Sequence, residues 1–310
     1  MYRKLLAICI PLGFAVSLTA ADESPTSGAK LSAAQIVDKN VAARGGLQAW
    51  RAVQTMTLAG KLGAGGNQRA TLQVPSSGPV SASAGRPSRP VLPQRPVDEV
   101  QLPFVMQLRR PRKMRFELQF NGKTAVQVYD GTNGWKLRPF LNRLEVEPYT
   151  ADEMKIASTQ ADLDGPLVDY AAKGTHIELA GMEKVEGRDT YKLKLTMKDG
   201  QTTQVWIDAE TFLEAKIEGH PKRLDGTEHP VEVYFRDYRP VGGLQIPYLL
   251  ETKVLSVGKN ALGLRDTPIP PEKIIVEKVV LNPKLEESRF TKPVVGDAKP
   301  AAVERASNGR

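Results

Sequence analysis

An alternation of apolar and polar residues at every second position constrains this chain most, because it is the pattern of a β-strand with one buried face. Apolar and polar side chains alternate from Lys113 to Phe120. Asn121-Gly122 follows, and this dipeptide is the strongest two-residue signal for a β-hairpin. Val126 and Val128 then occupy alternate positions of the returning segment. The pattern predicts an antiparallel hairpin with one apolar face.

The same arrangement recurs along the chain, in about ten segments of strand character. Asp130-Gly131, Asn133-Gly134 and Asp199-Gly200 provide further turns. The segments follow one another as hairpins rather than as strand–helix–strand units, which argues against a Rossmann-type sheet. A sheet of this size curls rather than staying flat. We therefore predict a mainly β fold of the α+β class: a single curved antiparallel sheet that forms an unclosed barrel, with helices across its concave side.

Two segments carry helix signals instead. Ser32 with Gln35, and Thr150 with Glu153, have the spacing of a capping box, which marks a helix start. Short apolar stripes follow both starts, and we expect the two helices to form a lid over the concave face. The lid residues are predicted to be Ile36, Val37, Val41, Met154 and Ile156.

The N-terminus has the layout of a cleaved secretory signal peptide, residues 1–21. Arg3 and Lys4 precede an apolar run, 5–18, that leads to Thr19-Ala20-Ala21. The run is too short for a membrane span, which needs about 20 residues. Cleavage removes Cys9, the chain's single cysteine, so the mature protein forms no disulfide. We expect a soluble periplasmic protein.

Composition divides the rest into a flexible N-terminus (22–30), one domain (31–295) and a polar tail (296–310). Within the domain, 63–98 is rich in Pro, Gly, Ser and Arg, and we expect it to be disordered. It is interpreted either as a tolerated surface insertion or as a basic arm that contacts a membrane surface. The formal charge of +8 suits anionic lipid headgroups or acidic proteins in an envelope compartment better than nucleic acid.

The sequence offers little that could catalyse a reaction. It has no Gly-x-Ser-x-Gly elbow, no His-Glu-x-x-His and no phosphate-binding glycine loop. His220 and His229 share a segment with Asp225 and Glu228, but their spacing fits no common metal site. We predict no catalytic residue, no metal and no cofactor, and hence no enzymatic activity.

The apolar face of the sheet remains as the candidate site. Periodicity leaves two readings open: a core filled by the helices, or a cavity for acyl chains, in which each buried methylene contributes about 0.8 kcal/mol. Under the second reading the lining residues are predicted to be Met114, Phe116, Leu118, Val126, Val128, Trp135, Leu193, Leu195, Val205, Ile207, Val233 and Phe235.

Several stretches, in this order, resemble a known family. They are Val126–Gly131 running into Gly134-Trp135, Gly165–Tyr170, Gly181–Leu195 (GMEKVEGRDTYKLKL), Trp206–Thr211 and Tyr238–Pro247 (YRPVGGLQIP). Together they resemble the outer-membrane lipoprotein-sorting superfamily, the LolA/LolB-like envelope proteins. The resemblance implies an unclosed barrel with a helical lid over a hydrophobic cavity. It also implies transport of lipoproteins or lipids from an inner-membrane donor to an outer-membrane acceptor, without a chemical step or a cofactor.

Two other functions stay open at this point. The same fold serves as a lipid- or lipoprotein-sensing regulator of the RseB type, which restrains a signalling partner. A metal-dependent hydrolase built on His220 and His229 is the other alternative.

Overall fold

The computed structural model describes residues 31–65, 99–139, 144–224, 227–259 and 269–298. The predicted signal peptide, most of the 63–98 insertion and the chain beyond Ala298 lie outside the described residues. The first strand runs to Gly65, so it includes the start of the predicted insertion. A 3₁₀ turn at Val295–Ala298 (η2) likewise includes the start of the predicted polar tail.

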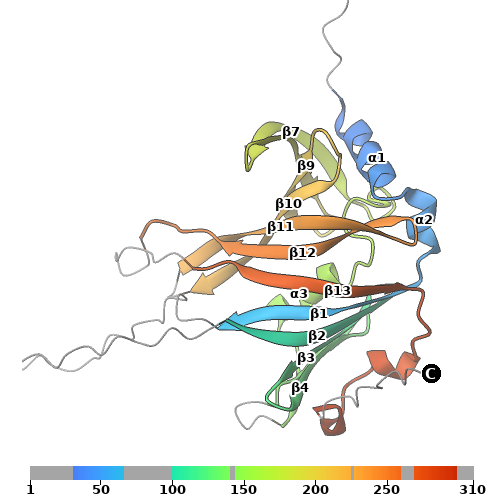
Figure 1. Cartoon of the computed structure of the whole chain (residues 1–310), viewed down its shortest axis with the longest axis vertical. Coiled ribbons are helices and arrows are strands. Elements are labelled where there is room, and N and C mark those ends of the chain that lie inside the picture. Colours follow the sequence, from blue (N-terminus) through green and yellow to red (C-terminus); the bar gives the residue numbers. More distant parts are fainter. Residues whose placement is uncertain (1–30, 66–98, 140–143, 225–226, 260–268, 299–310) are drawn as a thin grey trace, which may run out of the picture. The chain divides into compact units, whose positions relative to one another are not determined.

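The described chain forms one antiparallel sheet of thirteen strands in the order β6-β5-β4-β3-β2-β1-β13-β12-β11-β10-β9-β8-β7 (Figure 1). Both edge strands pair on one side only, so the sheet does not close into a barrel, and the predicted fold class is confirmed. The strands are β1 (Thr55–Gly65), β2 (Glu99–Arg109), β3 (Lys113–Phe120), β4 (Lys123–Tyr129), β5 (Gly134–Leu137), β6 (Val146–Pro148), β7 (His176–Val185), β8 (Arg188–Thr196), β9 (Thr202–Asp208), β10 (Glu214–Leu224), β11 (Thr227–Val241), β12 (Leu244–Val254) and β13 (Glu272–Leu281).

A two-residue turn sets the register of the β3–β4 hairpin. Asn121 and Gly122 both have positive φ, 46° and 69°, as a type I′ turn requires. The turn places Phe120 opposite Lys123 and Glu117 opposite Val126. Because side chains alternate between faces, this register decides which apolar residues of the two strands share a face.

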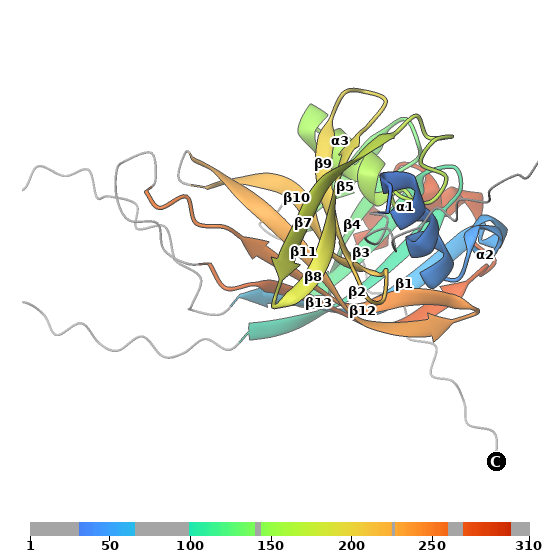
Figure 2. The ribbon, with the colours of Figure 1, turned by 90° about the horizontal axis from the view of Figure 1, so that it is seen from above.

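Three helices accompany the sheet: α1 (Ala33–Ala43), α2 (Leu47–Ala52) and α3 (Ala151–Gln160). Both predicted capping boxes are present, Ser32 with Gln35 and Thr150 with Glu153. Figure 2 shows α1 and α3 on the same side of β12 and β13. No helix in the described part of the chain combines the length and apolar character of a membrane span.

We call the face that packs against α2 and α3 the inner face. Its core cluster joins Trp50 of α2 and Ala157 of α3 to Met56, Met114 and Leu244 of the sheet. The other side is the outer face, and a C-terminal strap (282–298) crosses part of it.

The strap is fastened to the outer face of β3 and β4. Phe290, in a 3₁₀ turn at Glu287–Phe290 (η1), is 1% exposed. Arg289 pairs with Glu117 at 2.7 Å, and Ala298 packs against a cluster made by Val126, Val128 and Leu137. The strap thus closes a second, smaller core on the outer side of the sheet.

Candidate functional site

A row of paired residues crosses the inner face from β5 to β13. Each member lies opposite the next across one strand boundary. Lys136 stands at one end and is buried, whereas the residues that follow are half-buried. We call this set the Lys136 row; it consists of Lys136, Gln127, Phe116, Met106, Leu58 and Val279.

A second row crosses the same face nearer to the far ends of β1 and β12. All its members are apolar and half-buried. We call it the Leu250 row; it consists of Leu102, Leu62, Ile274, Leu250 and Phe235. The inner face therefore carries a continuous apolar surface that runs beyond the core cluster under the helices.

The inner face is covered unevenly. At the helical end Met56, Leu108 and Met114 are buried in the core cluster. The Lys136 row packs partly against the same cluster through Leu58 and Met106. Phe104 and Val276, which lie on the inner face between the two rows, are buried as well, whereas the Leu250 row is half-buried.

Helix α3 and the segment after it form the cover over the Lys136 row. Met154 and Ala157 of α3 pack against the core cluster, as do Ala161, Leu163 and Val168 beyond it. Ala157 is the buried residue of α3 itself. The segment 161–168 is more deeply embedded than the helix.

Lys136 and Glu153 join the cover to the sheet. Lys136 Nζ lies 2.6 Å from both carboxylate oxygens of Glu153, and 3.9 Å from Glu147 Oε2. Burial raises the pKa of Glu153, but hydrogen bonds from Lys136 and from the Thr150 backbone outweigh it and leave the pKa below its usual value. Glu153 is therefore ionised at neutral pH, and it neutralises a buried ammonium group.

A polar cluster anchors the segment after α3. Asp164 accepts hydrogen bonds from Arg110 at 2.7 Å and Lys173 at 3.0 Å, and its backbone carbonyl accepts one from Arg44 at 3.1 Å. Lys173 also contacts Asp162 at 2.9 Å. These contacts tie the segment to the β2–β3 hairpin and to the end of α1.

The two aspartates of this cluster have opposite pKa shifts. Burial, reinforced by the neighbouring Asp164, raises the pKa of Asp162 to about 6. Burial opposes ionisation of Asp164 as well, but hydrogen bonds from Asp162 and Arg110 lower its pKa to about 2. At mildly acidic pH Asp162 is therefore protonated and donates a hydrogen bond to ionised Asp164.

The predicted lining residues divide between the two faces. On the inner face the accessible ones are Phe116, Leu118, Val233 and Phe235, and the fully buried ones are Met114, Leu193, Leu195, Val205 and Ile207. Val126, Val128 and Trp135 lie on the outer face, because Val126 opposes Glu117, Val128 opposes Arg115 and Trp135 opposes Val128. These three pack into or against the outer cluster under the strap and do not join the inner set.

The predicted lid residues also differ in their surroundings. Ile36 and Val37 are fully buried core residues of α1. Val41 and Met154 are partly buried against the core cluster, and Ile156 is half-buried. Of the two predicted lid helices, α3 is the less embedded.

Lys136, Gln127 and Glu153 are not among the residues predicted from the sequence. Glu153 has the sequence signal of a capping residue, and Lys136 that of the polar member of an alternating strand. The turn at Asn121-Gly122 was a usable signal for Gln127, because it places this residue opposite Phe116. Nothing in the sequence indicates that α3 brings a carboxylate to Lys136.

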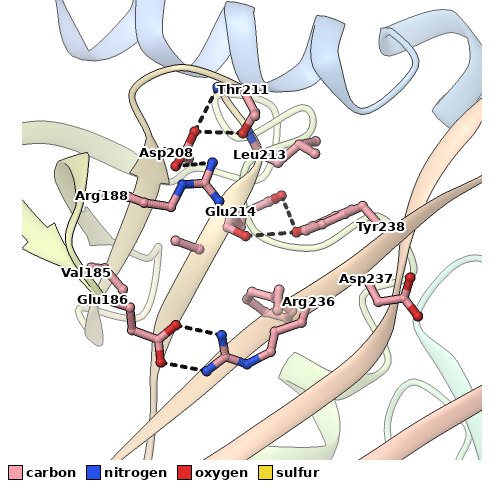
Figure 3. A pocket seen from close by; sticks show the side chains of 12 residues that line it. Val185, Glu186, Arg188, Asp208, Thr211, Leu213, Glu214, Arg236, Asp237 and Tyr238 are labelled. Carbon is pink, nitrogen blue, oxygen red and sulfur yellow. Dashed lines mark hydrogen bonds and ion pairs between the residues drawn. The ribbon is translucent and has the colours of Figure 1, made fainter.

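A polar pocket of about 350 Å³ lies near the start of β10 (Figure 3). Its charged side chains are paired within the protein: Glu186 with Arg236, Arg188 with Asp208, and Glu214 with the Tyr238 hydroxyl. These charged groups therefore already have partners within the protein, and we assign no ligand to the pocket.

The histidines do not assemble a metal site among the residues that can be described. His229 is buried in β11, with Nδ1 3.2 Å from the Leu255 carbonyl oxygen, and His220 is exposed in β10. No group of three or more His, Cys, Asp or Glu side chains suited to a metal ion occurs in that part of the chain. Glu228 is exposed in β11, and Asp225 lies outside the described residues.

No known family profile matches the sequence, and no curated protein matches it either. Among solved structures, the chain is similar to a LolA superfamily protein from Nitrosomonas europaea, with 12% identity, a TM-score of 0.48 and coverage of 85% of this chain and 99% of the other. It is also similar to a DUF1329 family protein from Desulfovibrio piger, with 13% identity, a TM-score of 0.49 and coverage of 84% and 98%.

A third similar structure is a putative outer membrane lipoprotein-sorting protein domain from Vibrio parahaemolyticus. Its identity is 11%, its TM-score is 0.47, and the match covers 84% of this chain and 96% of that one. At these identities the similarity concerns the fold alone.

Proposed function

We propose that this protein is a periplasmic carrier that binds the acyl chains of a lipid or lipoprotein against its inner face, without a chemical step. One observation supports this most: the apolar side chains of the Leu250 row, and those of the Lys136 row, are only half-buried on the inner face. A core that only stabilises the fold is expected to bury such residues fully. An extended apolar surface that stays partly accessible is typical of a binding site for an apolar ligand.

The energetics suit acyl chains. Each methylene moved from water to an apolar surface contributes about 0.8 kcal/mol, so a long chain binds without a specific polar contact. The predicted signal peptide supports a periplasmic location for this binding, where acylated cargo needs shielding from water. A donor at the inner membrane and an acceptor at the outer membrane would then supply and receive the cargo.

Adjacent residues in β12 and β13 provide a matched test. Leu250 and Ile274 oppose each other on the inner face, whereas Leu249 and Ile275 oppose each other on the outer face. We expect Leu250→Asp to weaken binding of a fluorescent fatty-acid probe at least tenfold, because it places a charge where the chain lies. Leu249→Asp is expected to leave binding unchanged.

Ile274→Asp and Ile275→Asp repeat the comparison on the neighbouring strand. Thermal unfolding of all four variants shows which remain folded, and only those enter the binding comparison. Equal binding by folded inner-face and outer-face variants would disprove the proposal, as would a wild-type protein that takes up no acyl probe.

A further inference from the structure

Lys136 is a buried cation at the end of an apolar surface. Its pairing with Gln127 places it on the inner face, between neighbours that point outward. Its side chain is 9% exposed. Burial of an ammonium group is costly unless an anion accompanies it, so this position requires an anionic partner.

The anionic partner comes from the cover and not from the sheet alone. Glu153 is a residue of α3, and its side chain is 35% exposed although Lys136 beneath it is buried. Both of its oxygens lie 2.6 Å from Lys136 Nζ. The anion thus approaches Lys136 from the solvent side, on an element that packs against the sheet through few buried residues.

The residues around Lys136 are arranged as in a binding site for an amphiphile, with a charged group at one end and apolar groups behind it. Behind the cation the row continues through Gln127 to apolar Phe116, Met106, Leu58 and Val279. Five strand spacings of about 4.8 Å give the row a length of roughly 24 Å. A ligand with an anionic head at Lys136 would lay the first part of its acyl chain along Phe116, because the segment after α3 packs with the cluster that covers Met106 and Leu58.

Helix α3 itself carries an anionic group followed by an apolar group. Glu153 supplies the anion, and the next residue, Met154, supplies an apolar side chain that packs with the core cluster. The helix therefore brings an anionic and an apolar side chain side by side, as an internal substitute for a ligand.

We propose that Lys136 is the headgroup site for an amphiphile with a phosphate or carboxylate head, and that Glu153 of α3 fills this site until the ligand replaces it. This inference rests on the proposed acyl-binding function and adds a preference for anionic heads. One carboxylate is exchanged for another anion, so Lys136 is never left buried and unpaired. The segment after α3 stays in place, because its own ties to Arg110 and Arg44 are separate.

Two single-chain detergents with the same dodecyl chain, dodecyl phosphate and the uncharged dodecyl maltoside, test the preference by displacement of a fluorescent acyl probe. We expect the wild type to bind the phosphate about tenfold more tightly, since a charge-assisted hydrogen bond contributes on that scale. Lys136→Met is expected to remove the difference, and Lys136→Arg to keep it. Glu153→Gln is expected to bind the phosphate more tightly than the wild type by about threefold or more, while a glutamine still completes the capping box.

Lys216 gives a matched control. It is an equally buried lysine, 2.6 Å from Glu232, but both residues belong to the sheet and share its outer face. Lys216→Met should leave the preference intact.

If Lys136→Met is folded and keeps the preference, or if wild type binds both detergents equally, the headgroup site is disproved while acyl binding stands. If neither detergent binds, the proposed function itself fails. Displacement by inorganic phosphate alone would show that the anion suffices, and would overturn the amphiphile assignment.

Discussion

Both faces of this sheet carry apolar residues, but the rest of the chain covers these residues to different extents. On the outer face, Val126, Val128 and Leu137 are fully buried, and Ala298 of the strap packs against them. On the inner face, the Leu250 row is half-buried throughout. The difference shows that apolar content alone does not mark a binding surface; what matters is whether the chain covers it.

The two buried lysines repeat this contrast. Lys216, on the outer face, lies 2.6 Å from Glu232 and 4.1 Å from the centroid of the Trp206 ring, and all three belong to the sheet. Lys136, on the inner face, pairs with a carboxylate that a helix brings. A pair inside one sheet stabilises the fold, whereas a pair between the sheet and a cover can also be exchanged.

The largest expected effect comes from removing the cover of the outer face. Phe290→Ala should lower the free energy of unfolding by about 4 kcal/mol, because the side chain is 1% exposed and leaves a cavity. Acyl binding by the folded protein should not change. Urea titration and probe binding measure the two quantities, and a loss of binding without a loss of stability would contradict the division of roles.

The inner face should respond in the opposite way. Phe116→Ala is expected to cost about 1.5 kcal/mol of stability, because the ring is only half-buried, yet to weaken acyl binding about tenfold. Val128→Ala, on the outer face of the same hairpin, should cost at least as much stability without affecting binding. Equal binding losses in the two variants would remove the distinction between the faces.

The aspartate cluster in the segment after α3 predicts a pH dependence. The raised pKa of Asp162, about 6 against an ordinary 3.8, favours the protonated folded protein, so its contribution to stability is present below about pH 4 and is lost as pH rises to 6. The lowered pKa of Asp164, about 2, acts in the other direction: its contribution is present above about pH 4 and is lost as pH falls to 2.

Asp162→Asn mimics the protonated form and sharpens this prediction. We expect the variant to be more stable than the wild type at pH 7 by about 1 kcal/mol, and to show a flatter stability profile between pH 4 and 6. Urea unfolding at several pH values measures both. A stability difference between Asp162→Asn and the wild type that does not grow from pH 4 to pH 6 would disprove the assignment.

The smallest effect is expected from an exposed ion pair of the outer face. Lys61 and Glu277 lie 2.9 Å apart with about half of each side chain exposed. Lys61→Gln should change the free energy of unfolding by less than about 0.5 kcal/mol, because solvent screens such pairs. A larger loss in urea titration would mean that the outer face depends on its surface charges more than its buried cluster suggests.

The sequence alone was sufficient for much of the architecture. Alternation and turn dipeptides predicted the hairpins and an open antiparallel sheet, and both capping boxes are present. About ten strands were expected against thirteen observed, since short strands such as β6 (Val146–Pro148) carry too few residues to show a period.

The face of β4 was harder, because this strand is apolar on both sides. Ala125 and Tyr129 lie on the inner face, and Val126 and Val128 lie on the outer face. The alternation does not show which of the two sets lies on the inner face. The two-residue turn before the strand fixes the register, and the register does show it.

Local patterns thus determined where this chain forms strands, turns and helix starts, because these depend on neighbours within a few residues. The tertiary structure decided which apolar face is covered and which lysine meets a carboxylate on a helix. Lys136 and Glu153 lie on different elements, and a strap from the C-terminus seals the outer cluster. Such contacts depend on how elements distant in the sequence pack together. The energy of these contacts therefore cannot be read from the local sequence of either residue.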